Sequence, residues 1–232
     1  MIYLKKFDSH ASYDTEINGG GVDISLPNVS YCEDVKDVHY TPYNLVRFYV
    51  GDITGTTPQT VKIIYANSSS IPIQVSEGNK WYTYVLPKDK GLYKIFGNSV
   101  KKVVVKADIT TNGKDVIIPS STIEASFKGS NTSNLTLIGG MFLRCSGLTS
   151  LDVSSFNTSN VTDMHGMFKN CVKLETLDLS GWDTSKVTDM LDMFKGCTSL
   201  RTITMVGCTT ETINKIKAQL TTDGIINNVT IG

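Results

Sequence analysis

The sequence carries no excess of charge of either sign, and it has few charged residues. Lys and Arg total 22, as do Asp and Glu, so the formal net charge is zero. This balance argues against binding to nucleic acid or to an anionic membrane by bulk electrostatic attraction. Charged residues form 19% of the chain, below the roughly 25% of an average soluble protein. Ser, Thr and Asn are abundant, which predicts a polar, largely uncharged surface of the kind common in extracellular and virion-surface proteins.

Long apolar runs and an export signal are also missing. No segment approaches the roughly 18 apolar residues of a membrane-spanning helix, so we expect no membrane insertion. The opening residues Met1–Asp8 lack the apolar core and the small-residue cleavage site of a signal peptide. We therefore expect either a signal removed upstream or another route out of the cell. A phage structural protein released by lysis needs no signal, so a virion is the alternative to an extracellular or cell-surface location.

Residues that typically carry catalysis are scarce. The three histidines are His10, His39 and His165. The sequence contains no nucleophile elbow, phosphate-binding loop, zinc-protease motif or paired-carboxylate context. We therefore expect no enzyme, no catalytic residue, no cofactor and no metal. His165 occupies a variable position that holds Leu191 in the next repeat, which predicts an exposed helix residue.

Five cysteines form an odd set, and three of them lie on a repeat. That pattern argues against a disulfide framework and favours buried thiols. Stacked strands lie about 4.8 Å apart, so equivalent cysteines approach the separation that a disulfide allows. A disulfide and a metal site are therefore alternatives. They are less favoured because ladder side chains point the same way and no Cys-x-x-Cys or Cys/His pairing accompanies them.

A repeat with a period of 26 residues dominates the second half of the chain. Met-Phe pairs begin at Met141, Met167 and Met193, and the three repeat cysteines are Cys145, Cys171 and Cys197. The phrase at 157–164 recurs at 183–190, and its first four residues occur identically at 131–134. A fixed period of this length is typical of a solenoid, whose units bury their apolar faces against one another. We predict about four turns, with an atypical first one.

The residues of one repeat predict a strand followed by a helix. The segment 148–154 alternates apolar and polar residues, which predicts a short strand with Leu148, Leu151 and Val153 inward. Phe156 and its counterpart Trp182 should return to the core. Ser159 or Asn160 could cap a short helix with Asp163 in its first turn. The residues of its apolar stripe are Val161, Met164, Met167 and Phe168.

The outward side chains of the repeat strands form the predicted ligand face. These residues are Ser150, Asp152, Ser154, Thr176, Asp178, Ser180, Thr202 and Thr204. Two stacked aspartate pairs, 152/178 and 163/189, could alternatively hold Ca²⁺. We favour hydrogen bonding to neighbouring turns or exposure to solvent for the first pair, and helix-dipole stabilisation for the second. Thr204 interrupts the first column.

The remaining segments complete the predicted domains. Residues 1–44 read as an irregular leader, and 45–106 as a small all-β sandwich or open barrel with strands at 45–50, 60–65, 71–75, 80–86 and 100–106. The solenoid spans 107–232, with 115–119 and 123–127 as a degenerate first turn. Its end, 209–232, should form a capping helix over Thr209–Leu220, a stop at Gly224 and a last strand.

The repeat phrase resembles a known family. Leu-x-x-Leu-Asp-(Val/Leu)-Ser-x-(Phe/Trp)-(Asn/Asp)-Thr-Ser-x-Val-Thr-Asp-Met-x-x-Met-Phe-x-x-Cys, over 131–208, is similar to the BspA-type leucine-rich repeats of bacterial surface proteins. The opening stretch, 4–10 with 26–32, resembles leader segments of repeat proteins from gut Bacteroidales and their phages. The resemblance implies a right-handed leucine-rich-repeat solenoid with a role in adhesion or protein binding. The predicted fold class is therefore α+β, a short solenoid preceded by a small all-β domain.

We accordingly expect a non-enzymatic protein-binding or cell-adhesion module displayed on a bacterial surface. Its partner would be a host or matrix protein, or a surface glycan, and not nucleic acid. The alternative is a structural or host-recognition component of a phage or surface assembly. In that case the N-terminal 44 residues would hold an oligomer together.

Overall fold

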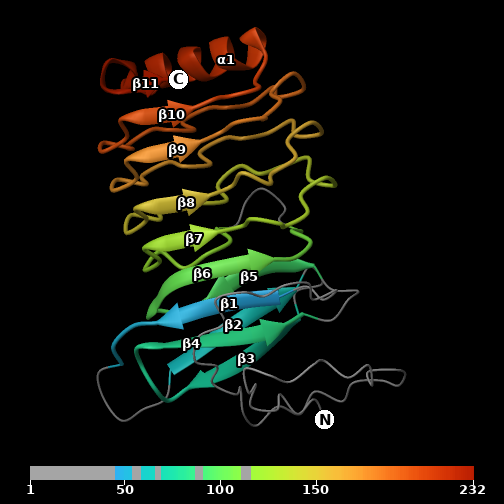
Figure 1. Cartoon of the computed structure of the whole chain (residues 1–232), viewed down its shortest axis with the longest axis vertical. Helices are drawn as coiled ribbons and strands as arrows, with labels where there is room; N and C mark the ends of the chain where they lie inside the picture. Colours follow the sequence, from blue (N-terminus) through green and yellow to red (C-terminus); the bar gives the residue numbers. More distant parts are fainter. Residues whose placement is uncertain (1–44, 54–58, 66–68, 87–90, 111–115) are drawn as a thin grey trace.

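The structure is a computed structural model that describes residues 45–53, 59–65, 69–86, 91–110 and 116–232 (Figure 1). The predicted leader at 1–44, with its resemblance and its proposed role in oligomerisation, lies outside the described residues. His10, His39 and Cys32 lie outside them too. The buried apolar residues form one contiguous cluster that runs from Val46 to Ile225. The division of the chain at 44, 106 and 208 stays a prediction.

The predicted fold class, an α+β leucine-rich-repeat solenoid behind a small all-β domain, is wrong. The described residues form three β-sheets and a single α-helix at the C-terminal end. Each repeat segment expected to be helical, such as 159–168, consists of turns and an isolated bridge. Several of its backbone amides donate to the next repeat and not to a preceding helical turn: the Met164 and Phe168 amides donate to the Asp189 and Met193 carbonyls at 2.8 and 2.9 Å.

The described chain opens with antiparallel strands that belong to two sheets. In the first, the strand order is β4 (Lys80–Val85), β1 (Leu45–Val50) and β6 (Val100–Lys106). In the second, it is β3 (Ser70–Val75), β2 (Gln59–Tyr65) and β5 (Leu92–Phe96). Five of these strands match the predicted ones and are confirmed.

Alternation of side chains explains how the two sheets pack. Strand β1 buries every second residue, Val46, Phe48 and Val50, as a period of two requires. Strand β2 does the same with Val61 and Ile63. The hydroxyls of Tyr65 on β2 and Tyr84 on β4 are 2.7 Å apart and buried, which joins the two sheets through their core. We call this region the sandwich.

Strand β6 connects the sandwich to the 26-residue repeats. It pairs antiparallel with β1 on one side and parallel with β7 (Glu124–Ser126) on the other. The next strands, one per repeat, are β8 (Ser150–Asp152), β9 (Thr176–Asp178) and β10 (Thr202–Thr204). Figure 1 shows them one above the other, so that each repeat adds one layer to a stack. We call this region the layer stack.

Side chains of the repeat phrase bond the layers together. The buried Thr158 hydroxyl accepts a hydrogen bond from the Asp183 amide at 2.8 Å and donates one to the Asp183 carbonyl at 3.0 Å. Thr132 makes the same pair of bonds with Asn157, at 2.8 and 3.3 Å. Phe142, Phe168 and Phe194 stack with ring centroids 5.7 and 5.9 Å apart. The recurrent Thr and Phe positions are therefore structural contacts between layers.

A helix covers the far end of the stack. Helix α1 (Thr210–Thr222) begins at the N-cap Thr209, whose side chain accepts a hydrogen bond from the Thr212 amide, so the predicted capping helix is confirmed. Ile216 and Leu220 are buried against the last layer. A 3-10 turn, η1 (Ile226–Asn228), and strand β11 (Thr230–Ile231), paired with β10, follow. With 13 residues, α1 is neither long nor apolar enough to span a membrane.

Side chains of α1 and its C-cap take the place of a missing layer. The Phe194 amide, whose counterparts in earlier layers donate to a carbonyl of the next repeat, donates to Asp223 Oδ2 at 2.9 Å. The Thr184 amide donates to Thr212 Oγ1 at 3.2 Å. Lys215 Nζ donates to the Thr184 carbonyl at 2.9 Å. These three backbone groups of the last layer therefore have hydrogen-bond partners, as a layer edge requires.

Candidate functional site

The outward side of strands β8 to β10 carries the eight residues of the predicted ligand face, which we call the sheet face. The inward residues between them, Leu151, Leu177 and Ile203, are buried. On the sheet face Ser150, Ser154, Thr176 and Asp178 are exposed, while Asp152, Ser180, Thr202 and Thr204 are half-buried. Thr176 and Asp178 lie beside Thr202 and Thr204 in parallel register. The predicted inward and outward sides of these strands are confirmed.

The two aspartates of the sheet face close turns within their own layers. Asp152 Oδ1 accepts hydrogen bonds from the Ser154 amide and hydroxyl at 3.0 and 2.7 Å. Its Oδ2 accepts from the hydroxyl of Ser126, in the neighbouring layer, at 3.3 Å. Asp178 Oδ1 accepts from the Ser180 amide at 2.9 Å. The favoured prediction for Asp152, a hydrogen bond to a neighbouring turn, is confirmed.

These contacts set the ionisation of Asp152. Burial by itself raises the pKa of this carboxyl, but the hydrogen bonds from Ser154 and Ser126 and the charge of Lys128 outweigh burial. The pKa of Asp152 therefore lies below its usual value, and the group is a carboxylate at neutral pH. The anionic oxygen atoms hold the turn together, which makes Asp152 a structural member of the sheet face.

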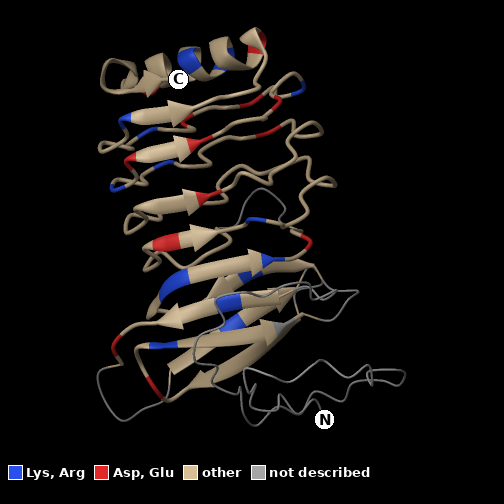
Figure 2. Cartoon of the chain, in the orientation of Figure 1, with Lys and Arg blue, Asp and Glu red and all other residues tan. Residues whose placement is uncertain are grey.

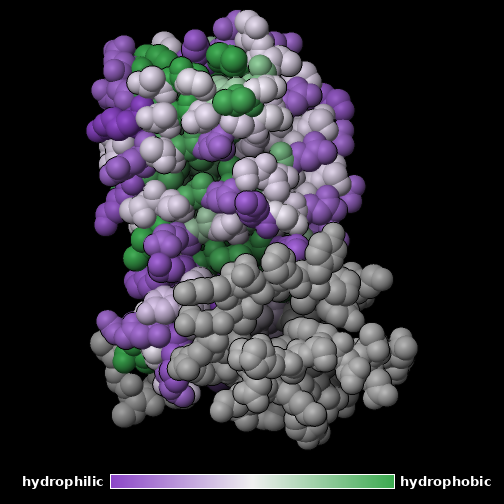
Figure 3. Space-filling model, in the orientation of Figure 1, coloured by the Kyte–Doolittle hydropathy of each residue, from purple (hydrophilic) through white to green (hydrophobic). Residues whose placement is uncertain are grey.

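The sheet face carries short side chains and is mildly acidic. Figure 2 shows acidic residues at the ends of β8 and β9, and basic residues on β6 and β1 beneath them. Lys102 on β6 forms an ion pair with Glu124 on β7 at 3.0 Å. In Figure 3, hydrophilic side chains follow both margins of the stack, with hydrophobic ones between them. Short Ser and Thr side chains on adjacent strands make a shallow surface, which suits contact with another surface better than enclosure of a small molecule.

The cysteine ladder lies in the core. Cys145, Cys171 and Cys197 are free and buried, so the favoured prediction of buried thiols is confirmed and the disulfide alternative for these three is wrong. The Cys171 and Cys197 thiols donate to the Phe142 and Phe168 carbonyls at 3.1 and 3.0 Å. Burial raises the pKa of Cys145 to about 12. Protonated thiols of this kind are poor nucleophiles and poor metal ligands.

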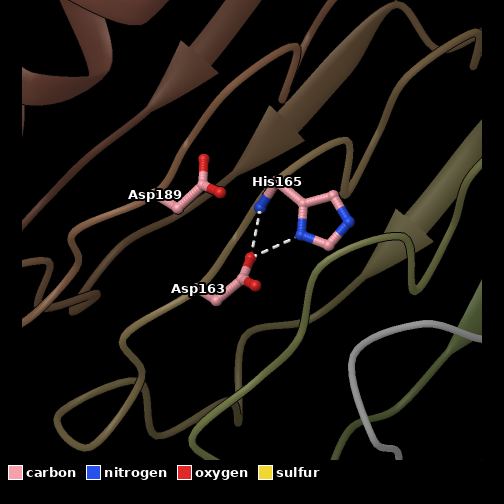
Figure 4. Close-up of side chains that lie close together, drawn as sticks. All are labelled: Asp163, His165 and Asp189. Atoms are coloured by element: carbon pink, nitrogen blue, oxygen red, sulfur yellow. Dashed lines mark hydrogen bonds and ion pairs between the residues drawn. The ribbon is translucent and has the colours of Figure 1, made fainter.

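A second cluster lies on another segment of the stack. Asp163, His165 and Asp189 each offer one ligand atom, and these atoms lie within 4.8 Å of one another (Figure 4). Asp163 Oδ1 accepts a hydrogen bond from the His165 amide at 2.8 Å and lies 2.6 Å from His165 Nδ1. Asp163 and Asp189 form a parallel bridge, so they occupy the same position in adjacent layers. We call these three residues the Asp-His-Asp cluster.

The sequence-based interpretation missed this cluster because it assigned a helix to the segment. In a helix, residues 163 and 165 would point in different directions, and His165 would face solvent by itself. In the observed extended bridge and turn, the Asp163 carboxylate reaches the backbone and the ring two residues later. The stacking of Asp163 with Asp189 was predicted correctly from the period. The period did not predict that the imidazole of His165 lies close to these two carboxylates.

A glycine makes room for the cluster. Gly139 precedes His165 by one repeat and is buried beneath it. A Cβ atom on Gly139 would overlap the imidazole ring and would lie 2.8 Å from Asp163 Oδ1, closer than real Cβ contacts. The packing of His165 against Asp163 therefore depends on a residue without a side chain at position 139.

Comparison with known proteins gives one match. Residues 114–223 are similar to a family whose model is described as "Mycoplasma protein of unknown function, DUF285". The matched segment contains the layer stack and α1. No curated protein and no solved structure matches the chain. These comparisons do not test the resemblance to BspA-type repeats, which stays a prediction.

Proposed function

We propose that this chain is a non-enzymatic protein-binding or cell-adhesion module displayed on a bacterial surface, with the sheet face as its contact surface. One observation carries the proposal: successive repeats present small polar side chains on the same side of adjacent strands, over a buried core. Ser150 and Thr176, which precede Leu151 and Leu177, are both exposed. A packed scaffold of this kind holds the contact residues in place before binding, which lowers the entropy cost of association.

The size of the face determines the expected strength of binding. Three short strands offer less area than the roughly 800 Å² per partner of a standard stable interface. A single module would therefore bind weakly, and adhesion would depend on many copies acting together on a cell or particle. The polar, uncharged character of the face suits a host or matrix protein, or a surface glycan.

Two further observations support a bacterial surface location. The matched family is described from Mycoplasma, which is in line with a bacterial source. The low share of charged residues, 19%, accompanies a surface rich in Ser, Thr and Asn. Such surfaces are common outside the cell.

The experiment is a surface-blocking substitution with a matched control. We expect Ser150→Lys combined with Thr176→Lys to weaken binding to immobilised laminin, collagen or a glycan array by at least roughly tenfold, because two long cations disrupt the complementarity of the face. Both side chains are exposed, so the fold should be unaffected. Asn134→Lys, an exposed position on another segment of the stack, is the control.

Equal binding by the double variant and the control would show that the sheet face is not the contact surface. Light scattering of the same samples tests the competing role. A stable oligomer that binds none of these probes would favour a structural part of a phage or surface assembly.

A further inference from the structure

We propose that Asp163, His165 and Asp189 bind one divalent transition-metal ion, with Zn²⁺ as the reference ion. The three residues come from two adjacent layers and present two carboxylates and one imidazole to a common point (Figure 4). The inference is independent of the proposed adhesion function, because the cluster lies on a different segment of each layer from the sheet face.

The donor atoms select the class of ion. Imidazole nitrogen combined with carboxylate oxygen suits Zn²⁺ and its first-row neighbours better than Ca²⁺ or Mg²⁺, which prefer oxygen alone. Bonds of roughly 2.0–2.2 Å in a tetrahedral site place neighbouring donors about 3.3 Å apart. His165 Nδ1 and Asp163 Oδ1 are 2.6 Å apart, and no donor pair exceeds 4.8 Å. Small side-chain rotations therefore suffice to bring all three donors onto one ion.

The charge of the cluster also favours a cation. Asp163 and Asp189 occupy the same position in adjacent layers, where like charges directly opposite destabilise a pair of strands. Within the described ranges, neither carboxylate has an ion pair with a lysine or arginine; Asp163 pairs with His165 alone. A bound divalent ion would replace that repulsion with two attractive contacts.

The surroundings shape an open site. Gly139 provides the space beneath the imidazole that any side chain would fill. Leu137, the bridge partner of Asp163, is 37% exposed, and Leu191, the counterpart of His165 in the next layer, is 64% exposed. Three protein ligands leave a coordination position for water or for a donor on a partner, which is the arrangement of sites that exchange a ligand. Both leucines are apolar, so neither adds a competing ligand atom to the cluster.

The experiment titrates Zn²⁺ into the full chain after treatment with a chelator, by calorimetry, and records the visible spectrum with Co²⁺ as a substitute. We expect one site per chain. His165→Leu copies the residue that the next layer carries at Leu191, so it should fold, and it should weaken Zn²⁺ binding by at least roughly tenfold. Asp189→Asn, which keeps the side-chain shape, should do the same.

Two further variants separate the site from general effects. Asp178→Asn changes an aspartate that also stacks on its neighbouring layer but lacks a histidine, so its affinity for Zn²⁺ should equal that of the wild type. Gly139→Ala retains all three donors and should nevertheless weaken binding, because the new methyl group displaces the imidazole. Zn²⁺ should also raise the unfolding temperature of the wild type and not that of His165→Leu, since a ligand stabilises only the state that binds it.

The proposal is overturned if the wild type fails to bind Zn²⁺ at about 1 mM, or if His165→Leu and Asp189→Asn bind with wild-type stoichiometry and affinity. The second result would place any bound ion elsewhere in the chain. If one variant fails to fold, the other decides. The binding assay of the preceding subsection is carried out with chelator present. A loss of adhesion there cannot come from a loss of Zn²⁺ binding, so the two proposals can fail independently.

Discussion

The sandwich and the layer stack use the same kind of strand, but only the stack takes its strand pairs from a constant distance along the chain. In the sandwich the distance varies: β2 pairs antiparallel with β3, which follows it directly, whereas Leu45 of β1 pairs with Lys106 of β6. In the stack, every strand pairs with one a full repeat away, as Glu124 does with Ser150. The period of two therefore identifies each sandwich strand but not its partner. The stack forms only when whole repeats come together, which is why a single repeat has no stable fold by itself.

The two regions nevertheless share one sheet and one core. Strand β6 is antiparallel to β1 and parallel to β7, so it belongs to both. On the opposite side, the Ile95 amide of β5 donates to the Ile117 carbonyl at 2.8 Å, and the Ile117 amide donates to the Met141 carbonyl at 2.9 Å. The sandwich thus covers the first layer with paired strands, whereas the last layer is covered by side chains of α1 and by the two-residue strand β11. This comparison predicts that the regions unfold together.

The largest expected effect tests that prediction. Phe48 in the sandwich and Phe142 in the stack are both fully buried. Phe48→Ala and Phe142→Ala should each lower the free energy of unfolding by about 3–5 kcal/mol, from lost burial and a new cavity. The two tryptophans, Trp81 on β4 and Trp182 in the stack, report each region separately by fluorescence when the other is replaced by Phe. Each alanine variant should shift both signals equally.

Independent shifts of the two fluorescence signals would contradict the prediction that the regions unfold together. If Phe48→Ala moves only the Trp81 transition and Phe142→Ala only the Trp182 transition, the regions are separate folding units despite their shared sheet.

The next effect concerns the C-terminal end of the stack, which α1 covers. Asp223→Ala removes the oxygen that accepts the Phe194 amide and leaves that donor buried without a partner. Such a loss costs about 1–3 kcal/mol. Denaturant unfolding measures the cost, and hydrogen exchange should show faster exchange of the Phe194 amide. Glu211→Ala, on the exposed first turn of α1, is the control and should change stability by less than about 1 kcal/mol. Equal effects would mean that the C-terminal contact is dispensable.

A smaller effect separates buried from exposed threonines. Thr158→Val keeps the shape of the side chain but removes both hydrogen bonds to Asp183, so stability should fall by about 1–2 kcal/mol. Thr60→Val on β2 removes an exposed hydroxyl bond to Gln74 and should have almost no effect. Thermal unfolding of the pair checks the difference. Similar losses at both positions would show that the threonine ladder does not stabilise the stack more than a surface contact does.

The smallest effect depends on pH. Because the folded pKa of Asp152 is below its unfolded value, its contribution to stability is present above roughly pH 4 and is lost as the pH falls through the folded pKa. Asp152→Asn should therefore be less stable than the wild type at pH 7, and the difference should shrink at pH 3. Unfolding curves at the two pH values measure it. A difference that stays constant with pH would mean that the carboxylate charge is irrelevant to this turn.

Sequence reasoning succeeded where side-chain burial follows a local period. The predicted ends of five sandwich strands and of the capping helix lie within two residues of the observed ends. Strand β5 was missed because a register shift opposite Ile64 and Tyr65 breaks its alternation. As a result its buried residues, Leu92 and Ile95, are three positions apart and do not show the spacing of a strand.

Sequence reasoning failed in the segment after each repeat strand, where buried residues with helical spacing led to the prediction of a helix that does not form. Val161, Met164 and Phe168 are buried as predicted, yet none of them lies in a helix. Gly166 has a positive φ of 56° and Asn170 one of 62°, conformations that interrupt a helix. The same error separated His165 from Asp163 and hid the Asp-His-Asp cluster.

The sequence by itself determined which residues of each repeat are buried, where each repeat begins and that the repeats stack, because apolar side chains at a fixed period must find equivalent neighbours. Only the tertiary structure decided that the segment after each repeat strand is turned instead of helical, and that His165 meets Asp163 and Asp189. The physical reason is that many backbone amides of each layer, such as those of Met164 and Phe168, bond to carbonyls about a whole repeat away. No local window of sequence contains those partners, so none could show which conformation they stabilise.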